Sequence, residues 1–305
     1  MKAIVVTDKS AGTAGMELAD QPEPQPGVGD VVVEVHASGF THDELTWPGT
    51  WTDRFGRDRM PVIPGQEVAG VVSALGYGTR GLQVGQRVFG LADGYRTGTL
   101  AEYIAIDARN LAPLSVDIDF VDAASLAMPG LTAWQGLFDY GHLQAGQSVF
   151  VPGAAGAVGS VVVQLARAAG ARVIGGGRAA HRETVLEFGA NEFVDLEGDD
   201  LAAVGGVNLV FDVFGGEIGA RAAKLVAPGG TLVSIAGPPA ARPVDATVID
   251  FVVIPDRAQL TEIALRFADG RLHSHIGQVV SLEEAAAALG APKRPSGKTI
   301  VQVRP

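Results

Sequence analysis

Short runs of apolar residues, separated by glycine and proline, dominate about the first 110 residues of the chain. The runs are Ala3–Thr7, Asp30–Ser38, Glu67–Leu75, Arg87–Gly90 and Thr99–Ile106. Runs of this length between turn residues are typical of β-strands. This part of the sequence therefore predicts a small, irregular β-domain, with a long loop between Gly39 and Gly65.

The pattern changes at Ser148, where predicted strands begin to alternate with predicted helices. Strands are predicted at Ser148–Val151, Arg172–Gly175, Glu192–Val194, Val207–Asp212, Thr231–Ala236 and Phe251–Ile254. Between the first two strands, apolar residues recur at helical spacing from Val158 to Ala169. This alternation predicts right-handed crossovers and a parallel sheet, and hence an α/β fold. After about residue 258 the pattern predicts a helix, a strand (Gln278–Val280), a helix (Leu282–Leu289) and a final strand (Thr299–Val303).

The first strand of the alternating region runs directly into a glycine-rich turn. Gly153, Gly156 and Gly159 follow the strand and open the helix, which is the context of a dinucleotide-binding fingerprint. Small residues allow the backbone to approach a pyrophosphate, and the helix N-terminus offers it N–H groups and a partial positive charge. The residues predicted to contact the cofactor here are Gly153, Ala154, Ala155, Gly156, Ala157, Val158 and Gly159. The alternative is a tight turn in which the glycines serve packing alone.

The residues after the second strand of this region bear on which nicotinamide dinucleotide is bound. An NAD site normally has an acidic residue there, which bonds the ribose 2′-hydroxyl. This sequence has Gly177 and Arg178 at that place, followed by His181. A guanidinium is suited to a 2′-phosphate, so the sequence favours NADP(H), with these three residues as contacts. The alternative is a solvated helix start with ordinary basic residues.

Composition narrows the remaining possibilities. A chain of 305 residues is long enough for two hydrophobic cores, and 47% hydrophobic with 19% charged residues is typical of a globular protein. The net charge of −11 disfavours binding to nucleic acid or to anionic membrane surfaces. The absence of cysteine excludes disulfides, thiolate chemistry and zinc sites with a cysteine ligand. The N-terminal apolar run lacks the features of a signal peptide, so we expect a cytoplasmic protein without membrane spans.

Six stretches of the sequence resemble the medium-chain dehydrogenase/reductase superfamily, specifically its zinc-free quinone oxidoreductase branch. They are Gly65–Val72, Val84–Val88, Pro129–Ala133, the glycine turn, Phe211–Gly216 and Gly297–Val301. The resemblance extends over nearly the whole chain. It implies a GroES-like β-barrel substrate domain at residues 1–115, a Rossmann NADP-binding domain with a doubly wound parallel sheet at residues 116–257, and a C-terminal return to the substrate domain at residues 258–305.

The same resemblance implies further residues of the site. Zinc-dependent relatives have a histidine ligand after the first glycine of the segment like Gly65–Val72 and a cysteine ligand near Thr41. Gln66 and Thr41 are poor zinc ligands, so no catalytic metal is expected. The resemblance also implies that Thr132 lies near the nicotinamide and that Lys298 points toward the cofactor. Other residues expected to line the cofactor cleft are Phe214, Ile235, Ala236, Gly237, Val252 and Val253.

The expected chemistry follows from the missing metal. Without a metal to polarise a carbonyl, hydride addition to a quinone or an activated enone is favoured over ordinary alcohol oxidation. The reaction needs a proton donor, and the candidates in the substrate loops are Thr41, His42 and Tyr95. We therefore predict an NADPH-dependent quinone or enone reductase, which the family suggests is a homodimer. A biosynthetic enoyl or ketone reductase and a non-catalytic NADPH-sensing protein are the alternatives.

Overall fold

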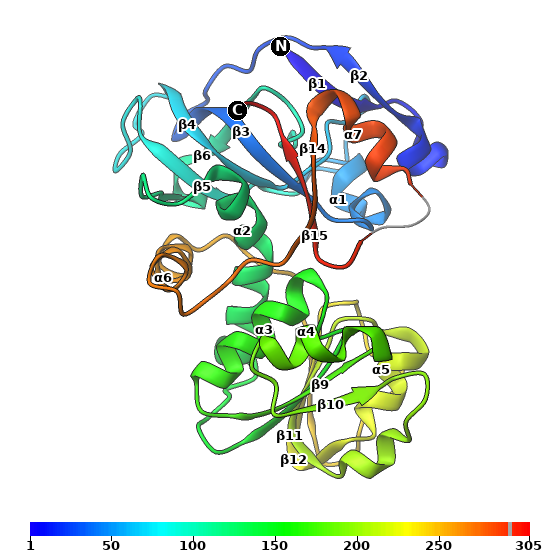
Figure 1. Ribbon diagram of the computed structural model, residues 1–305. Coiled ribbons are helices and arrows are strands. Elements are labelled where there is room, and N and C mark those ends of the chain that lie inside the picture. The colour runs from blue at the N-terminus through cyan, green and yellow to red at the C-terminus, as the bar shows by residue number, and fades with distance from the viewer. Residues whose placement is uncertain (292–294) are drawn as a thin grey trace. The chain divides into compact units, whose positions relative to one another are not determined.

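The computed structural model describes residues 1–291 and 295–305, which form two compact units (Figure 1). The first unit contains Met1–Met128, Ile254–Ala268 and Ile276–Pro305, and the second contains Pro129–Val253 and Asp269–His275. Each unit buries its own apolar clusters, as two-domain chains of this length do. The domain boundaries expected near residues 115 and 257 remain a prediction.

Antiparallel β-structure makes up most of the first unit. Its strands are β1 (Lys2–Val6), β2 (Met16–Asp20), β3 (Asp30–Phe40), β4 (Glu67–Leu75), β5 (Arg87–Leu91), β6 (Tyr103–Asp107), β7 (Leu111–Pro113), β14 (Ile276–Ser281) and β15 (Lys298–Gln302). The larger sheet has the order β14-β15-β3-β4-β5-β7, with β6 paired to β3, and β1 pairs with β2. The predicted β-domain is confirmed, and the C-terminal strands belong to it.

The long loop after β3 is packed against the core of this unit. It contains a 3₁₀ turn at Glu44–Thr46 and the short helix α1 (Pro48–Trp51). Leu45 and Trp51 are buried with Phe40 in one apolar cluster, and the Trp51 indole donates a hydrogen bond to the Leu45 carbonyl over 2.7 Å. The loop therefore has a fixed course, which sets the positions of the polar residues at its start.

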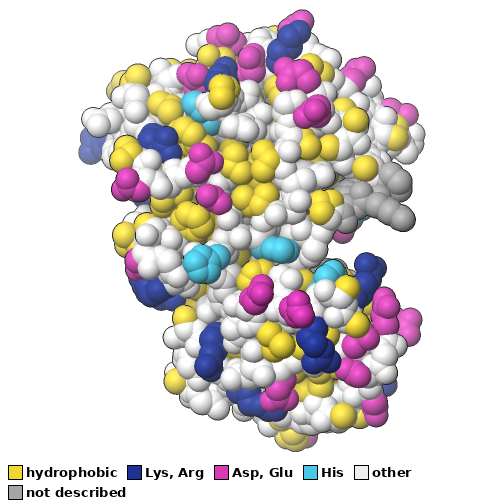
Figure 2. Space-filling view, viewed as in Figure 1, with side chains coloured by type: hydrophobic (Ala, Val, Ile, Leu, Met, Phe, Trp, Pro, Cys, Tyr) yellow, Lys and Arg dark blue, Asp and Glu magenta, His cyan; other side chains and the backbone are white. Residues whose placement is uncertain are grey.

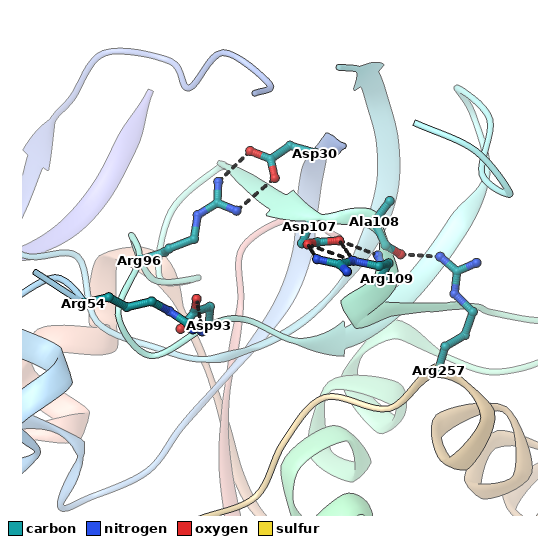
Figure 3. Close-up of polar contacts among 8 residues, drawn as sticks. All are labelled: Asp30, Arg54, Asp93, Arg96, Asp107, Ala108, Arg109 and Arg257. Atoms are coloured by element: carbon teal, nitrogen blue, oxygen red, sulfur yellow. Dashed lines mark hydrogen bonds and ion pairs between the residues drawn. The ribbon is translucent and has the colours of Figure 1, made fainter. Parts of the chain in front are cut away.

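Three further helices include residues of the first unit. They are α2 (Phe120–Trp134), whose residues from Pro129 onward belong to the second unit, α6 (Arg257–Ala268) and α7 (Leu282–Leu289). Arg257 fixes the start of α6, because its guanidinium donates to the Leu111 carbonyl over 2.7 Å and to the Ala108 carbonyl (Figure 3). A capping box between Ser281 and Glu284 opens α7, as expected for a helix that starts after a strand.

The second unit is built on a six-stranded parallel sheet, which confirms the predicted sheet. Its strands are β8 (Ser148–Pro152), β9 (Arg172–Gly177), β10 (Glu192–Asp195), β11 (Val207–Asp212), β12 (Val226–Ser234) and β13 (Thr247–Asp250), in the order β10-β9-β8-β11-β12-β13. The helices are α3 (Ala157–Ala168), α4 (Arg182–Glu187) and α5 (Gly216–Ala223). The strand order reverses between β8 and β11, and ligands of such sheets bind beyond the carboxyl ends of the strands at this switch point.

The elements of the structure differ from the sequence-based prediction in two places. The strand expected at Phe251–Ile254 is wrong: β13 covers Thr247–Asp250 and pairs with β12 only as far as Ser234, where β12 ends. The apolar character of residues 251–254 does not show that the neighbouring strand β12 has already ended at Ser234. Helix α2 was not expected, because Pro129 within it is normally a helix breaker.

The surface is charged with both signs. On the face in Figure 2, Lys and Arg side chains are interspersed with Asp and Glu side chains over both units. In the part of the chain that the structure describes, none of the helices is both long enough and apolar enough to span a bilayer.

Candidate functional site

The glycine turn after β8 has the geometry of a pyrophosphate cradle. Gly153 has a φ of 80°, which favours glycine, and Gly156 is the N-cap of α3 without a side-chain cap. A Cβ on Gly159 would overlap the Gly153 carbonyl oxygen, so only glycine allows α3 to pack this closely on the turn. A Cβ on Gly156 would meet only the Gly153 oxygen, at 3.2 Å, so this position faces nearly open space. Together with the helix N-terminus, this shape fits a dinucleotide phosphate.

The turns after β11 and β12 lie at the same edge of the sheet. The buried Asp212 carboxylate accepts hydrogen bonds from the Phe214 and Gly215 N–H groups, each over 3.0 Å. A Cβ on Gly153 would collide with Val213 and the Phe214 ring, so the two turns are neighbours. The Ile235 N–H donates to the Asp212 carbonyl over 3.0 Å. The structure therefore brings Phe214 and the turn Ile235–Gly237 together with the glycine turn.

Three of the residues predicted to lie near the nicotinamide belong to the second unit. Thr132 is buried in α2, Val252 is exposed and Val253 is half-buried just beyond β13. Their roles stay predictions.

The end of β9 contains the residues predicted to contact a 2′-phosphate. Gly177 is the last residue of β9, Arg178 follows it with an exposed side chain, and His181 ends the short 3₁₀ turn Ala179–His181. The Arg178 Nε atom lies 3.3 Å from Glu197 Oε1. Glu197 follows β10, which pairs with β9 at Gly177 and Asp195. A carboxylate therefore stands beside this guanidinium, although the nearest carboxylate in the sequence is Glu183.

A second polar site lies in the first unit, at the start of the long loop. Thr41 follows β3, and three residues later the buried Glu44 carboxylate points back toward the backbone. That carboxylate accepts the Thr41 N–H over 3.1 Å and the Gly65 N–H. Glu44 thereby joins the two loop ends that flank the long loop. Sequence analysis missed this role, because a glutamate in a loop normally points to solvent.

Lys298 and Glu67 form a buried ion pair beside Thr41. Lys298 opens β15 and Glu67 opens β4, and both side chains are less than 10% exposed. The Lys298 ammonium also donates to Thr41 Oγ1 over 3.3 Å, and the Glu67 carboxylate accepts the Met128 N–H over 3.2 Å. Between the two strands, Gly39 of β3 supplies the space: a Cβ there would overlap the Glu67 carboxylate. The sequence could not reveal this pair, whose members are far apart along the chain.

Burial shifts the acidity of both carboxyl groups. Desolvation raises the pKa of Glu44 from 4.5 to about 7, although the N–H groups of Gly65 and Thr41 and the Lys298 ammonium act against it. Desolvation also raises the pKa of Glu67, again against the attraction of Lys298. The Lys298 ammonium therefore lowers the pKa of two buried carboxyl groups, Glu67 through direct contact and Glu44 through space.

The other predicted proton donors are exposed. His42 Nε2 lies 3.9 Å from Asp43 Oδ1, and both side chains are exposed. The Tyr95 ring lies under the Arg54 guanidinium, whose Cζ atom is 5.7 Å from the ring centroid, and Tyr95 is 44% exposed. Of the three candidates, Thr41 alone contacts the buried charged cluster among the described residues.

The residues at the two positions where zinc ligands would be expected are poor metal donors. Gln66 precedes β4, with its backbone carbonyl bonded to the Ala92 N–H over 2.6 Å, and neither Gln66 nor Thr41 offers an imidazole, thiolate or carboxylate. Within residues 1–291 and 295–305, no group of three or more His, Cys, Asp or Glu side chains is arranged to hold a metal ion.

Family models match both parts of the fold. A model described as alcohol dehydrogenase GroES-like domain matches residues 27–116, and one described as zinc-binding dehydrogenase matches residues 157–265. The predicted fold class is thereby confirmed: a Rossmann-like parallel sheet plus a GroES-like β-domain.

Named relatives and a solved structure agree with these matches. The chain is 33% identical to the synaptic vesicle membrane protein VAT-1 homolog of Rattus norvegicus, over 77% of this chain and 59% of that protein. It is 32% identical to the quinone oxidoreductase of Rattus norvegicus, over 77% of this chain and 73% of that protein. The match thus spans about three fifths of the VAT-1 homolog. A crystal structure of an alcohol dehydrogenase superfamily protein from Novosphingobium aromaticivorans superposes with a TM-score of 0.86, at 28% identity and over 100% of both chains.

Proposed function

Because this chain belongs to the medium-chain dehydrogenase/reductase superfamily, in its quinone oxidoreductase-like branch, we propose that it reduces a quinone or an activated enone with NADPH. The observation that carries the proposal is the Gly153–Gly159 turn, which leaves β8 at the switch point of a parallel sheet. NADPH bound at this turn would supply the hydride. The chain itself holds the dinucleotide, orients the acceptor and provides a proton.

The proposed cofactor contacts divide by chemistry. The N–H groups at the start of α3 face the pyrophosphate, and Arg178 and His181 bind the 2′-phosphate. The turns with Phe214 and Ile235–Gly237 border the same crevice, and Thr132, Val252, Val253 and Lys298 complete the set that the family implies.

The proposed reaction does not use zinc. Thr41 and Gln66 stand where zinc-dependent relatives have cysteine and histidine ligands, and hydroxyl and amide groups bind zinc poorly. A quinone or enone delocalises the negative charge that hydride addition creates, so it reacts with less electrophilic assistance than a simple ketone. The donor set therefore favours a conjugated acceptor.

A homodimer in the cytoplasm completes the proposal. The edge strand β13 has a partner on one side only, β12, within the described sheet, and such an edge can pair with a second copy.

A substrate screen tests the proposed activity. Purified chain is mixed with NADPH and a panel of benzoquinones, naphthoquinones and α,β-unsaturated ketones, and NADPH absorbance is followed with and without EDTA. We expect acceptor-dependent NADPH oxidation that EDTA leaves unchanged. Absence of oxidation across the panel would contradict the proposal.

The same preparation separates the alternatives. If an enoyl thioester or a ketone is reduced far faster than the quinones, with the product identified by mass spectrometry, the chain is a biosynthetic reductase. If calorimetry detects NADPH binding while every acceptor fails, the chain is a cofactor-sensing protein.

A further inference from the structure

The hydrogen bonds of Thr41 bear on which group could supply the proton. The Thr41 hydroxyl is held between two partners: it accepts from the Lys298 ammonium and donates to Met128 Sδ, each over 3.3 Å. A thioether sulfur is a weak acceptor. The hydroxyl proton is therefore available to a stronger acceptor, such as a negatively charged oxygen.

Stability alone does not account for the ion pair behind Thr41. Removing Lys298 and Glu67 from water costs free energy that their attraction only partly returns, and buried ion pairs are often replaceable by apolar residues without loss of stability. The fold nevertheless makes room for this pair by having Gly39 at the crossing point of β3. Glu44 adds rigidity, since it ties the backbone at Thr41 to Gly65.

We propose that Thr41, Lys298 and Glu67 form a proton relay, in which the Thr41 hydroxyl protonates the reduced acceptor and the Lys298 ammonium, held by Glu67, replaces that proton. The proposal rests on the proposed reductase function. Thr41 is the catalytic residue, and Lys298 and Glu67 are positioning residues that act through it.

The relay conserves protons and charge at each step. After hydride transfer the acceptor carries a negative charge on oxygen. The O–H bond of Thr41 breaks as the acceptor oxygen gains the proton, and an N–H bond of Lys298 breaks as a new O–H bond forms on Thr41. Lys298 is left as a neutral amine next to Glu67, and it regains a proton from water after the product leaves.

Steady-state kinetics of Thr41→Val, Lys298→Met and their double variant test the relay. We expect kcat to fall about 100-fold in each, the usual range for a lost general acid, with the NADPH dissociation constant unchanged in Thr41→Val. Because the two residues act in one path, the double variant should lose no more than the single variants do. Wild-type kcat in Thr41→Val, or losses that multiply in the double variant, would overturn the relay.

Lys298→Arg separates a relay from simple electrostatic positioning. Arginine keeps the charge and the donors but does not release a proton at neutral pH, so we expect kcat to stay as low as in Lys298→Met. Full activity in Lys298→Arg would overturn the relay. If Lys298→Met fails to fold, the double variant Glu67→Gln/Lys298→Met, which does not leave Glu67 as an unpaired buried charge, replaces it.

A matched control breaks an ion pair at the opposite end of the same strand. The Arg96 guanidinium binds the Asp30 carboxylate through two bonds of 2.9 and 2.6 Å (Figure 3), about 35 Å along β3 from Thr41. Arg96→Met should lower stability and leave kcat unchanged. If the wild-type chain turns over no acceptor, the proposed function fails and the relay fails with it. If the wild-type chain is active and Thr41→Val and Lys298→Met keep its kcat, the relay alone fails.

Discussion

Arg178 carries the expected preference for NADPH at the level of one side chain. Its guanidinium is paired with Glu197, which follows β10, and both side chains are exposed. An exposed pair of this kind is weak, so a phosphate can displace the carboxylate.

Replacing Arg178 should change the nucleotide preference. For Arg178→Ala we expect the ratio of NADPH to NADH affinity to fall about 10- to 100-fold, the value of one or two charge-assisted hydrogen bonds. Isothermal titration with both nucleotides measures the ratio. Glu197→Gln is the matched control and should bind NADPH at least as tightly as wild type. An unchanged ratio in Arg178→Ala would remove Arg178 from the proposed site.

Single residues also mark the limit of prediction from sequence. Gly153, Gly156 and Gly159 could be recognised because their function depends on local spacing. Glu197 beside Arg178 and Glu67 beside Lys298 could not, because each pair is made by strand pairing between distant segments. The residue type indicates which interactions a side chain can form, and the fold determines which partner it contacts.

The turn between β8 and α3 combines a packing role and a binding role that can be separated. Gly159→Ala should destabilise the chain by about 1–3 kcal/mol, because its Cβ would overlap the Gly153 carbonyl. Gly156→Ala should fold nearly normally, yet bind NADPH at least about tenfold more weakly, because its methyl group would occupy the approach of the pyrophosphate. Thermal unfolding and NADPH titration measure the two effects. Normal NADPH binding by Gly156→Ala would argue against the cradle.

Elements with regular patterns were predicted well, and those that break a local rule were not. β4 and β11 have the predicted bounds, since each is a continuous apolar run between turn residues. α2 contains Pro129 and was missed, and the edge strand β13 lies four residues before its predicted start. In both cases tertiary packing overrides the local signal.

At the scale of the whole molecule, Glu44 makes the stability of the fold depend on pH. Its pKa is about 7 in the folded chain and near 4.5 when unfolded, so the folded state holds the proton more tightly. The stability contributed by protonated Glu44 is present below about pH 4.5 and is lost as the pH rises toward 7. The loss amounts to at most about 3–4 kcal/mol, at about 1.4 kcal/mol for each unit of pKa shift.

Denaturant unfolding between pH 5 and pH 8 measures this dependence. We expect Glu44→Gln to flatten the fall in the free energy of unfolding that the wild-type chain shows over this range. Glu217→Gln, at an exposed position in α5, should leave the fall unchanged. Identical slopes in wild type and Glu44→Gln would mean that Glu44 remains ionised in the folded chain.

The pairing of Arg178 with Glu197 also bears on how cofactor preference can evolve. A carboxylate next to the 2′ position is the group that NAD-dependent enzymes use to bind the ribose hydroxyl. In this chain the Glu197 carboxylate is paired with the Arg178 guanidinium. In the proposed site, loss of Arg178 would remove the phosphate partner and leave Glu197 able to accept from a ribose hydroxyl, so a single substitution would reverse the nucleotide preference.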